Sequence, residues 1–531
     1  MTLPRGKKMG KGTRKVKQAL GAAINRTVVT AALLLLQVIW LAVLAGWLSE
    51  YSRLFNAFGL TLSVLMCMAI IRKDSTTPEF KIGWMLVFMI MPVQGGILYL
   101  LWGDKRPMLH LRSRLEKAQE AVAPLRRQDP DALRALEQAD PRAAQTARYL
   151  RDYGPCPLYG GSEVKYYPCG EAMLTDVRAA LEGARRFIFV ETFILAQGTL
   201  WDQMHDILRR KAAEGVEVRL LYDDAGSLTV LPGRYWKTLE AEGIHAVSFN
   251  HFVPWLNLVM NNRDHRKILV VDGVTAFTGG VNIADEYVNR YERFGYWKDS
   301  AVRVRGPAAW SFATMFLEFW QANRQEPPGA GGPERFRPTP AEAAAAAPEG
   351  QCLVQPYCDS PVDRESVSKN VLLEIIMQAR ETLQIATPYL ILDNDLLTAL
   401  TLAAKRGVTV RIFTPGIPDK KLIYQLTRSY FAPLIRAGVH VYTFTPGFLH
   451  AKTWLCDGHI GMVGSVNLDY RSMYLHFECG AILYDAPALA EIRRDFNGLL
   501  HDSHEVALTE CRTGFAGSLV SAILRMIAPL C

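Results

Sequence analysis

The chain has 531 residues, which exceeds the usual size of one hydrophobic core and leaves room for several domains. Its formal net charge is +8, but residues 1–26 hold eight basic side chains and no acidic one. Removing those eight from 60 basic residues leaves 52 against 52 acidic residues. A nucleic-acid enzyme spreads basic charge over its substrate face, so the neutral remainder argues against a nucleic-acid partner. Nine cysteines with no CxxC pair and no zinc-like Cys/His spacing predict no metal site.

The N-terminal part carries three apolar stretches, at 28–48, 54–71 and 82–102. About 20 apolar positions in a helix cross a hydrocarbon layer, so we expect a basic cytoplasmic tail at 1–27 and a multi-pass transmembrane region at 28–103. Because the basic tail should stay in the cytoplasm, three crossings place the rest of the chain on the outer face of a cell membrane. Two crossings would return it to the cytoplasm.

The remainder of the chain repeats one plan. Residues 104–155 are rich in Ala, Arg, Glu and Leu at helical spacing, and we interpret them as a helical connector that acts as a solvated spacer. Two similar domains are expected at 156–325 and 351–505. The segment 326–350, rich in Pro, Gly and Ala, should be a flexible linker. An amphipathic segment at 506–531 should dock on the second domain.

Each domain shows a β-branched or aromatic run, then a helical pattern, then a second apolar run. This alternation predicts an α/β fold with parallel strands covered by helices. Two similar α/β domains packed pseudo-symmetrically are therefore expected behind the transmembrane helices. The segments are Phe187–Ile194, a helix through Glu214 and Val216–Tyr222 in the first domain, and Leu383–Ile391, Asp393–Arg406 and Val408–Thr414 in the second.

Two copies of one motif carry the most information. Each copy has a histidine, a lysine two positions later and an aspartate seven positions after the histidine. The copies are His265, Lys267 and Asp272, and His450, Lys452 and Asp457. Asn282 follows His265 by 17 positions (282 − 265), and Asn467 follows His450 by 17 (467 − 450). One copy alone would indicate an ordinary strand edge, but the matched pair favours a duplicated catalytic site.

Residue parity assigns the motif side chains to faces. His265 and Lys267 stand two positions apart beside a β-branched run, so on a strand their side chains leave the same face and can reach one phosphate. Asp272 lies an odd number of positions from His265 and points to the opposite face. The second copy has the same parity, so Asp272 and Asp457 are expected to orient the catalytic motif more than to touch substrate.

A glycine-rich element follows each copy and completes the candidate site. Gly280 and Ser465 stand where the backbone can approach closely, and Asn282 and Asn467 can donate amide hydrogen bonds to a phosphoryl oxygen. These four residues are predicted to bind or support a substrate phosphate.

Two histidines, two lysines and two asparagines are sufficient for phosphoryl transfer at a diester without a metal or cofactor. One neutral imidazole attacks phosphorus while the other, protonated, gives its proton to the leaving oxygen. Because a free histidine titrates near pH 6.5, we expect that keeping one ring protonated and the other neutral costs little free energy at neutral pH. Each half alone would be half a site. The other nine histidines, His476 among them, fall outside the pattern.

At the two motifs the chain resembles the phospholipase D superfamily, and within it the bacterial cardiolipin synthases. The supporting strings include Gly279-Gly-Val-Asn-Ile-Ala-Asp-Glu-Tyr287 and Gly464-Ser-Val-Asn-Leu-Asp-Tyr-Arg-Ser472. The resemblance implies transfer of a phosphatidyl group between two phosphatidylglycerol molecules through a phosphohistidine, with release of glycerol. It also implies that two acids, Asp299 and Glu478, each support the catalytic histidine of their own half.

Other functions stay open at this point. A hydrolytic phospholipase D or another phosphatidyltransferase would share the motifs, because they do not encode how water is excluded. A nuclease would share them too, although the neutral catalytic part argues against it, and a catalytically inactive membrane scaffold is an alternative of another class. We expect His265 to be the nucleophile and His450 the acid and base, with membrane phospholipids as partners. The sequence fixes neither the oligomeric state nor the acyl-chain preference.

Overall fold

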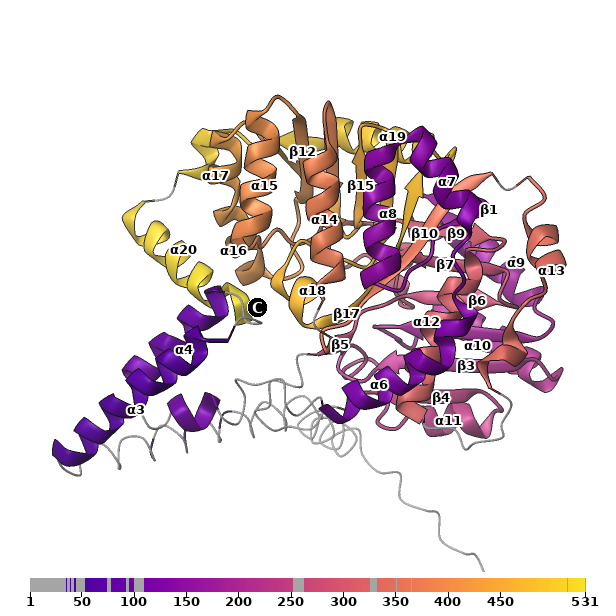
Figure 1. Cartoon of the computed structure of the whole chain (residues 1–531), viewed down its shortest axis with the longest axis horizontal. Coiled ribbons are helices and arrows are strands. Elements are labelled where there is room, and N and C mark those ends of the chain that lie inside the picture. Colours follow the sequence, from indigo (N-terminus) through magenta and orange to yellow (C-terminus); the bar gives the residue numbers. More distant parts are fainter. Residues whose placement is uncertain are drawn as a thin grey trace, which may run out of the picture.

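Two α/β halves share one continuous sheet in the computed structural model (Figure 1). Antiparallel pairing of β1 (Tyr159–Tyr167) with β10 (Cys352–Asp359) joins the halves at the centre of that sheet. The structure describes Leu35, Ile39 and Val43, and residues 53–73, 78–91, 95–99, 109–251, 262–324, 332–349, 351–363, 365–512 and 514–530.

The first half places its strands and helices in alternation along the chain. After β1 its strands are β2 (Phe187–Thr192), β3 (Glu217–Asp223), β4 (His245–Phe249), β5 (Arg263–Asp264), β6 (Ile268–Val271), β7 (Thr275–Gly279), β8 (Tyr296–Lys298) and β9 (Ala301–Arg305). Its helices are α9 (Gly170–Glu182), α10 (Thr199–Ala213), α11 (Trp236–Ala241), η4 (Asp285–Val288) and α12 (Ala309–Arg324).

The second half repeats this order. After β10 its strands are β11 (Thr382–Ala386), β12 (Thr409–Pro415), β13 (His440–Phe444), β14 (Gly447–Leu449), β15 (Thr453–Cys456), β16 (Ile460–Gly464), β17 (His476–Tyr484) and β18 (Ser503–Glu505). Its helices are α14 (Val367–Gln378), α15 (Asn394–Lys405), α16 (Lys421–Ser429), α17 (Phe431–Arg436), α18 (Tyr470–Tyr474) and α19 (Ala488–His501).

Strand order gives the sheet a pseudo-two-fold symmetry. From the centre outward one half runs β1-β9-β7-β6-β2-β3-β4 and the other runs β10-β17-β16-β15-β11-β12-β13, with β18 at the edge. Strands β2, β3 and β4 are parallel, as are β11, β12 and β13, and antiparallel hairpins carry the two motifs. The expected α/β fold with two similar domains is confirmed.

The expected strand–helix–strand segments match β2, α10 and β3 in the first half and β11, α15 and β12 in the second. The one clear difference is the run Leu383–Ile391, where β11 ends at Ala386. Pro388 follows two positions later, and a proline cannot donate a ladder hydrogen bond in a central strand.

The connector before β1 is helical but is not a solvated spacer. It forms α6 (Leu109–Val122), η2 (Ala123–Leu125), α7 (Pro130–Ala139) and α8 (Pro141–Tyr153). Leu115, Val122, Leu136 and Leu150 are buried, since α6 packs on α12 and α8 packs on α14. Apolar side chains on one face of each helix bind it to the domain cores, which the helical pattern alone did not reveal.

The segment expected to be a flexible linker contains packed structure over residues 332–349. η5 (Pro333–Phe336) packs the buried Phe336 ring edge-on against both Phe187 and Phe189, at centroid distances of 5.0 and 5.1 Å. The alanine run forms α13 (Pro340–Ala346), which begins at a capping box of Thr339 and Glu342. A buried aromatic ring and a helix cap therefore hold this segment on the first half.

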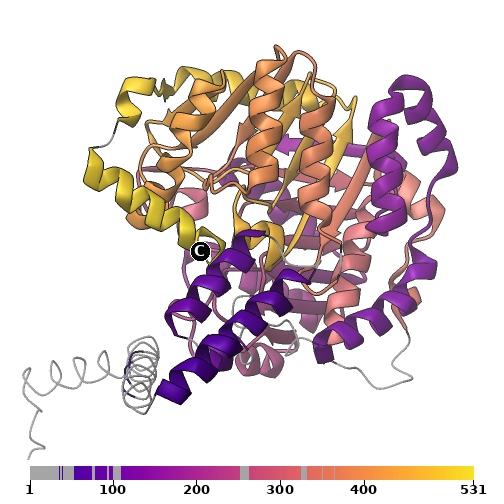
Figure 2. The ribbon, with the colours of Figure 1, turned by 60° about the vertical axis from the view of Figure 1, so that its left-hand side comes forward.

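Three helices lie outside the two α/β halves. Of the N-terminal part, the structure describes α3 (Arg53–Ile71) and α4 (Pro78–Ile90), and the expected span at 28–48 lies almost entirely outside the described residues. Among the described residues, no helix combines the length and apolarity that crossing a membrane requires. Figure 2 shows the C-terminal helix α20 (Phe515–Ile527), followed by η7 (Ala528–Leu530), beside these N-terminal helices. Leu524 and Ala528 are buried, so the tail docks as expected.

The motif aspartates form the turns of the two hairpins. Asp272 and Asp457 have φ values of 53° and 50°, and each precedes a glycine that also has positive φ. The Asp272 carboxylate accepts backbone hydrogen bonds from Arg185, Arg186 and Phe187 at 2.8–3.0 Å. Asp457 accepts three equivalent bonds at 2.8 Å from residues 380–382. Each carboxylate therefore fastens a hairpin to the start of the neighbouring strand, β2 in the first half and β11 in the second, which agrees with the parity prediction.

Replacing Asp457 with alanine should destabilise the second half. Asp457→Ala loses three hydrogen bonds to a charged acceptor and places alanine at positive φ, which together cost about 2–4 kcal/mol. Thermal unfolding of the purified full chain should show a melting temperature lower by several degrees, with Asp206→Ala on the exposed face of α10 as control. An unchanged melting temperature with lost activity would instead make Asp457 a chemical participant.

Candidate active site

His265 lies between β5 and β6 and is buried against the second half. Its Nδ1 lies 3.0 and 3.1 Å from the two carboxylate oxygens of Glu478, on β17. Because a carboxylate at this distance accepts, Nδ1 carries the proton and Nε2 keeps a free electron pair. The Phe193 ring packs against the imidazole at a centroid distance of 5.1 Å.

His450 lies after β14 and is buried against the first half. Its Nδ1 lies 2.7 Å from Oδ2 of Asp299, which follows β8. Tyr287 and Trp297 pack on the imidazole, each at a centroid distance of 5.3 Å. The two histidines thus have the same kind of environment, a fully buried carboxylate behind Nδ1 and aromatic rings beside it.

The carboxylates are exchanged between the halves, so the expectation that each acid supports the histidine of its own half is wrong. The register of two short parallel pairs explains the exchange. β5 pairs with β17 so that Asp264 is opposite Phe477, which places the next residues, His265 and Glu478, together. β14 pairs with β8 in the same way: Leu449 is opposite Lys298, and His450 and Asp299 follow. Backbone bonds from His265 N to Phe477 O at 3.0 Å and from His450 N to Lys298 O at 2.7 Å fix both registers.

Small residues after each hairpin make room for the carboxylates. A Cβ on Gly280 would lie 2.0 Å from Oδ1 of Asp299, so no larger side chain fits there. At the corresponding position Ser465 donates from its hydroxyl to Glu478, and Ser472 donates to the other Glu478 oxygen at 2.7 Å. Gly280 and Ser465 therefore support the acids, and the prediction that they bind or support a substrate phosphate stays a prediction.

The two lysines stand beside the histidines. Lys267 Nζ donates to the carbonyl of His265 at 2.5 Å, and Lys452 Nζ lies 2.9 and 3.1 Å from the two ring nitrogens of His450. The intervening Arg266 points away, into a buried ion pair with Glu191 at 2.5 Å. The histidine and the lysine therefore point to one side and the residue between them to the other, as the motif spacing predicts.

Burial controls the protonation of this site. Burial lowers the pKa of His450 to about 4, with a further contribution from Lys452, and lowers the pKa of His265 well below its usual value. Opposite protonation of the two rings is therefore not cheap in the free site, contrary to expectation, because burial makes both imidazoles neutral near pH 7. Burial also lowers the pKa of Lys267 to about 8 and that of Lys452 to about 7.

The two motifs lie within electrostatic reach of each other. The charge of Lys267 lowers the pKa of both His450 and Lys452 in the other half. Burial alone would raise the pKa of Glu478, but the adjoining His265 holds it well below its usual range. The same balance with His450 lowers the pKa of Asp299. Both acids are therefore ionised at neutral pH.

The two asparagines, Asn282 and Asn467, differ in their hydrogen bonding. Asn282 accepts from the backbone N–H of Ile194 at 3.0 Å and donates to the Tyr287 hydroxyl at 2.8 Å. Asn467 is buried, and its Oδ1 has no hydrogen-bond partner among the described residues.

Sequence reasoning missed three residues of this site. Ser472 supports Glu478, Trp297 packs on His450, and His476 lies beside His265 at a ring-centroid distance of 5.2 Å. Trp297 and His476 both stand two positions before the exchanged acid on a strand, so the period-2 rule would have placed them on the same face as that acid.

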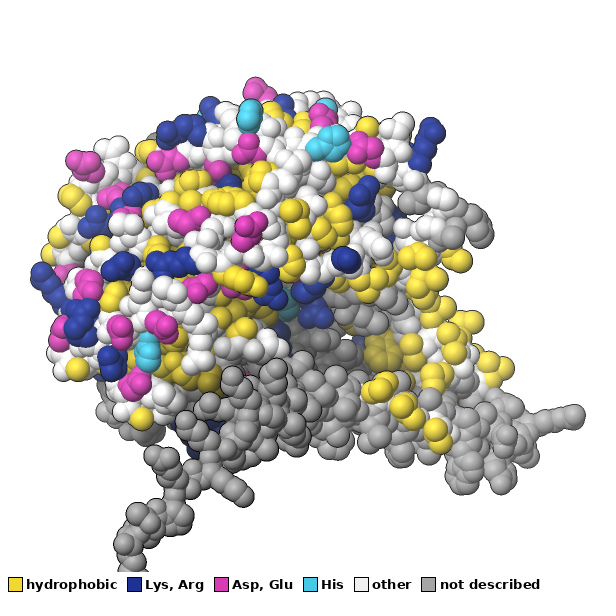
Figure 3. Space-filling view, turned by 180° about the vertical axis from the view of Figure 1, so that it is seen from behind, with side chains coloured by type: hydrophobic (Ala, Val, Ile, Leu, Met, Phe, Trp, Pro, Cys, Tyr) yellow, Lys and Arg dark blue, Asp and Glu magenta, His cyan; other side chains and the backbone are white. Residues whose placement is uncertain are grey.

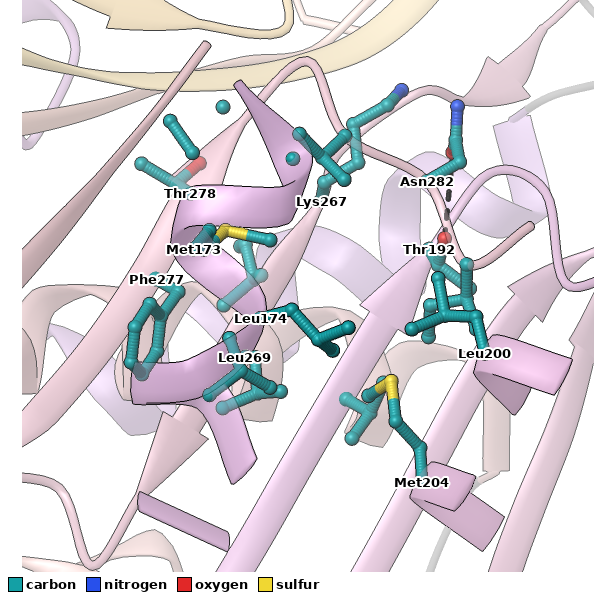
Figure 4. Close-up of a pocket in the computed structure, with 18 of the residues that line it drawn as sticks. Met173, Leu174, Thr192, Leu200, Met204, Lys267, Leu269, Phe277, Thr278 and Asn282 are labelled. Carbon is teal, nitrogen blue, oxygen red and sulfur yellow. Dashed lines mark hydrogen bonds between the residues drawn. The ribbon is translucent and has the colours of Figure 1, made fainter. Parts of the chain in front are cut away.

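An apolar cavity opens beside Lys267 (Figure 4). Met173, Leu174, Leu200 and Met204 from α9 and α10 line it below Lys267. Its volume of about 60 Å³ is well under the roughly 150 Å³ of a cavity that holds benzene. In this conformation it can therefore accept only a few carbon atoms of a lipid.

Comparison with known proteins identifies the architecture. The family described as "Cardiolipin synthase, PLD-like domain" matches residues 177–303 and 372–500, and "Phospholipase_D-nuclease N-terminal" matches 61–103. A protein of Streptococcus mutans described as uncharacterized is 40% identical over 450 residues, covering 85% of this chain and 96% of its own length. A cardiolipin synthase of Alkalihalophilus pseudofirmus is 33% identical over 476 residues, covering 88% of this chain and 92% of its own length.

Among solved structures, phosphatidylserine synthase from Haemophilus influenzae superposes with a TM-score of 0.54 at 17% identity, covering 73% of this chain and 98% of its own. That likeness shows a shared fold. The two matched domains, together with relatives of this identity aligned over most of their length, show that the chain belongs to the cardiolipin synthase family of phospholipase D-like phosphatidyltransferases.

Proposed function

We propose that the chain transfers a phosphatidyl group from one phosphatidylglycerol to another through a phosphohistidine, giving cardiolipin and glycerol. The observation that carries this proposal is the pair of buried imidazoles, each with a carboxylate of the other half behind Nδ1. A carboxylate in that place fixes the tautomer, so each ring presents Nε2 to a phosphate between the halves.

In the first step, Nε2 of His265 attacks phosphorus and the bond from phosphorus to the glycerol oxygen breaks. Protonated His450 gives its proton to that oxygen, and glycerol leaves. In the second step, neutral His450 removes the proton from a hydroxyl of the second phosphatidylglycerol, whose oxygen attacks phosphorus. The phosphorus–nitrogen bond breaks, which releases cardiolipin and restores both rings.

Binding of the phosphodiester favours the protonated form of His450, which the first step requires. The pKa of His450 near 4 leaves this ring neutral in the free site. An anionic phosphate beside Nε2 favours the charged imidazolium and raises that pKa on binding. Lys267 and Lys452 hold the equatorial oxygens, and Asn282 and Asn467 are positioned to contribute amide groups. Substrate binding therefore favours the protonation of His450, the general acid of the first step.

The N-terminal region should hold the site at a lipid surface. Large apolar side chains on α3 and α4 are more than half exposed, including Phe58, Leu60, Met89 and Ile90 at 63–77%. Such a face exceeds what a soluble surface presents. Figure 3 shows hydrophobic side chains gathered over these protruding helices. α20 adds a half-exposed face, which includes Leu519 and Ile523. This continuity supports membrane attachment through residues 28–103, with α20 at the same surface.

Three crossings would place the catalytic part on the outer face of a cell membrane. Protease added to intact cells should then cut the catalytic part, whereas cutting only after lysis would place it in the cytoplasm and contradict the three-crossing arrangement.

The reaction itself can be tested with purified protein and phosphatidylglycerol vesicles. Cardiolipin and glycerol should form in equal amounts, and His265→Ala and His450→Ala should each lower the rate at least about 10³-fold, because neither ring can take both roles. His440→Ala, at an exposed position of β13 next to the edge strand β18, is the matched control and should keep the wild-type rate. Phosphatidic acid as sole product would identify a hydrolytic phospholipase D. Cardiolipin made by either single variant above a few per cent would contradict the shared site.

Titration of the two lysines should limit activity on the alkaline side. A lysine whose pKa is lowered keeps its charge below that pKa and loses it above. The first step needs protonated His450, whose pKa of about 4 in the free site already makes kcat/KM fall with rising pH below pH 7. The pKa values of about 7 for Lys452 and about 8 for Lys267 therefore predict that this fall becomes steeper between pH 7 and 9. Steady-state assays over pH 5.5–9.5 check this. A kcat/KM that stays level to pH 9 would contradict the buried, weakly basic lysines.

A further inference from the structure

His476 is a third histidine at the catalytic centre that the transfer reaction does not use. It begins β17 two positions before Glu478, and its side chain is 8% exposed. Neither ring nitrogen has a hydrogen-bond partner within the part of the chain that the structure describes. A buried imidazole without a hydrogen bond is costly, because its polar atoms have left water without full compensation. This side chain is therefore positioned to bind something that enters the site.

Three potential ligand atoms converge at this place. His476 Nδ1 lies 3.7 Å from Oε1 of Glu478, and His265 Nδ1 lies 3.0 Å from the same oxygen. Ligand atoms of the three residues all lie within 4.8 Å of one another. Atoms bonded at about 2.0–2.2 Å to one tetrahedral zinc ion stand roughly 3.3 Å apart, so small side-chain rotations suffice to complete the set.

The chemical states of Glu478 and His265 also suit a cation. Glu478 is ionised, and burial keeps His265 neutral near pH 7. Metal affinity requires a deprotonated carboxylate and neutral imidazoles, so neither of these two groups has to lose a proton to solvent. Two imidazoles and one carboxylate are a ligand set that zinc and similar borderline cations accept.

The other half of the site cannot bind a cation in this way. The position two residues before Asp299 is Trp297, whose ring packs on His450 but whose indole nitrogen is a donor only. The pseudo-symmetric site therefore differs at one residue, and among the residues that the structure describes three ligands come together around His265 but not around His450.

We propose that His265, His476 and Glu478 form a site for one zinc-class divalent cation, which inhibits the enzyme when it binds. Coordination by Nδ1 of His265 moves the proton of that ring to Nε2. The electron pair that would attack phosphorus is then no longer available. The cation would also occupy Glu478, which otherwise orients the ring. Inhibition rests on the proposed transfer reaction, whereas binding of the cation does not.

Cobalt(II) titration of the purified full chain tests binding directly. His476→Phe keeps an aromatic ring without a ligand atom, and His440→Phe removes an exposed histidine on β13 as the matched control. The wild type and His440→Phe should bind one more equivalent of cobalt than His476→Phe. That equivalent should show visible ligand-field bands without the sulfur-to-cobalt charge transfer that cysteine ligands produce. His476→Asn serves the same purpose should the phenylalanine variant fail to fold.

The second measurement is the inhibition of cardiolipin formation by zinc. The rate of each variant is compared with the rate of the same variant in the presence of a chelator. The zinc concentration that halves cardiolipin formation should be at least about 10-fold higher in His476→Phe than in the wild type. Equal cobalt binding by the wild type and both His476 variants would overturn the site. A changed pH profile with unchanged cobalt binding would make His476 a proton-holding neighbour and would also overturn it. Cobalt binding that depends on His476 in a chain that makes no cardiolipin would refute the proposed function and leave the cation site standing.

Discussion

The exchange of carboxylates between the halves is the constraint on which the site depends. His265 and Glu478 are 213 residues apart, and His450 and Asp299 are 151 residues apart. Two parallel pairs of two or three residues bring them together. A shift of either pair by one residue would turn the acid away from the imidazole, because successive side chains on a strand point to opposite faces. The central pairing of β1 with β10 joins the halves, so moving them apart would break both histidine–carboxylate pairs.

Burial and the exchanged carboxylates have opposite effects on the protonation of the two histidines. Removing an imidazole and a lysine from water favours their neutral forms, whereas an ionised carboxylate behind each ring favours a proton on Nδ1. The result is a free site with two neutral imidazoles and two ionised carboxylates, in which an anionic phosphodiester would favour protonation of a ring on binding.

Local patterns in the sequence predicted the fold class and the two His/Lys pairs well. The strand–helix–strand order follows from hydrophobic periodicity, and the matched spacing of His265 to Asn282 and His450 to Asn467 reveals the duplication. The partners of the histidines could not be predicted in this way, because they depend on registers between strands that are far apart in the chain. Ser472 and His476 are single residues with no repeat to mark them. The packing of α6 and α8, and the capping of α13 by Thr339, depend on surfaces that only the folded halves present.

Nitrogen-15 NMR of the full chain labelled at histidine tests the exchange most directly, since the Nδ1 signal reports the hydrogen bond behind each ring. Glu478→Gln should shift the Nδ1 signal of His265 and leave that of His450 in place, and Asp299→Asn should do the reverse. His265→Gln and His450→Gln assign the two signals. A shift of His450 on substitution of Glu478, with His265 unchanged, would show that each acid serves its own half and would contradict the account.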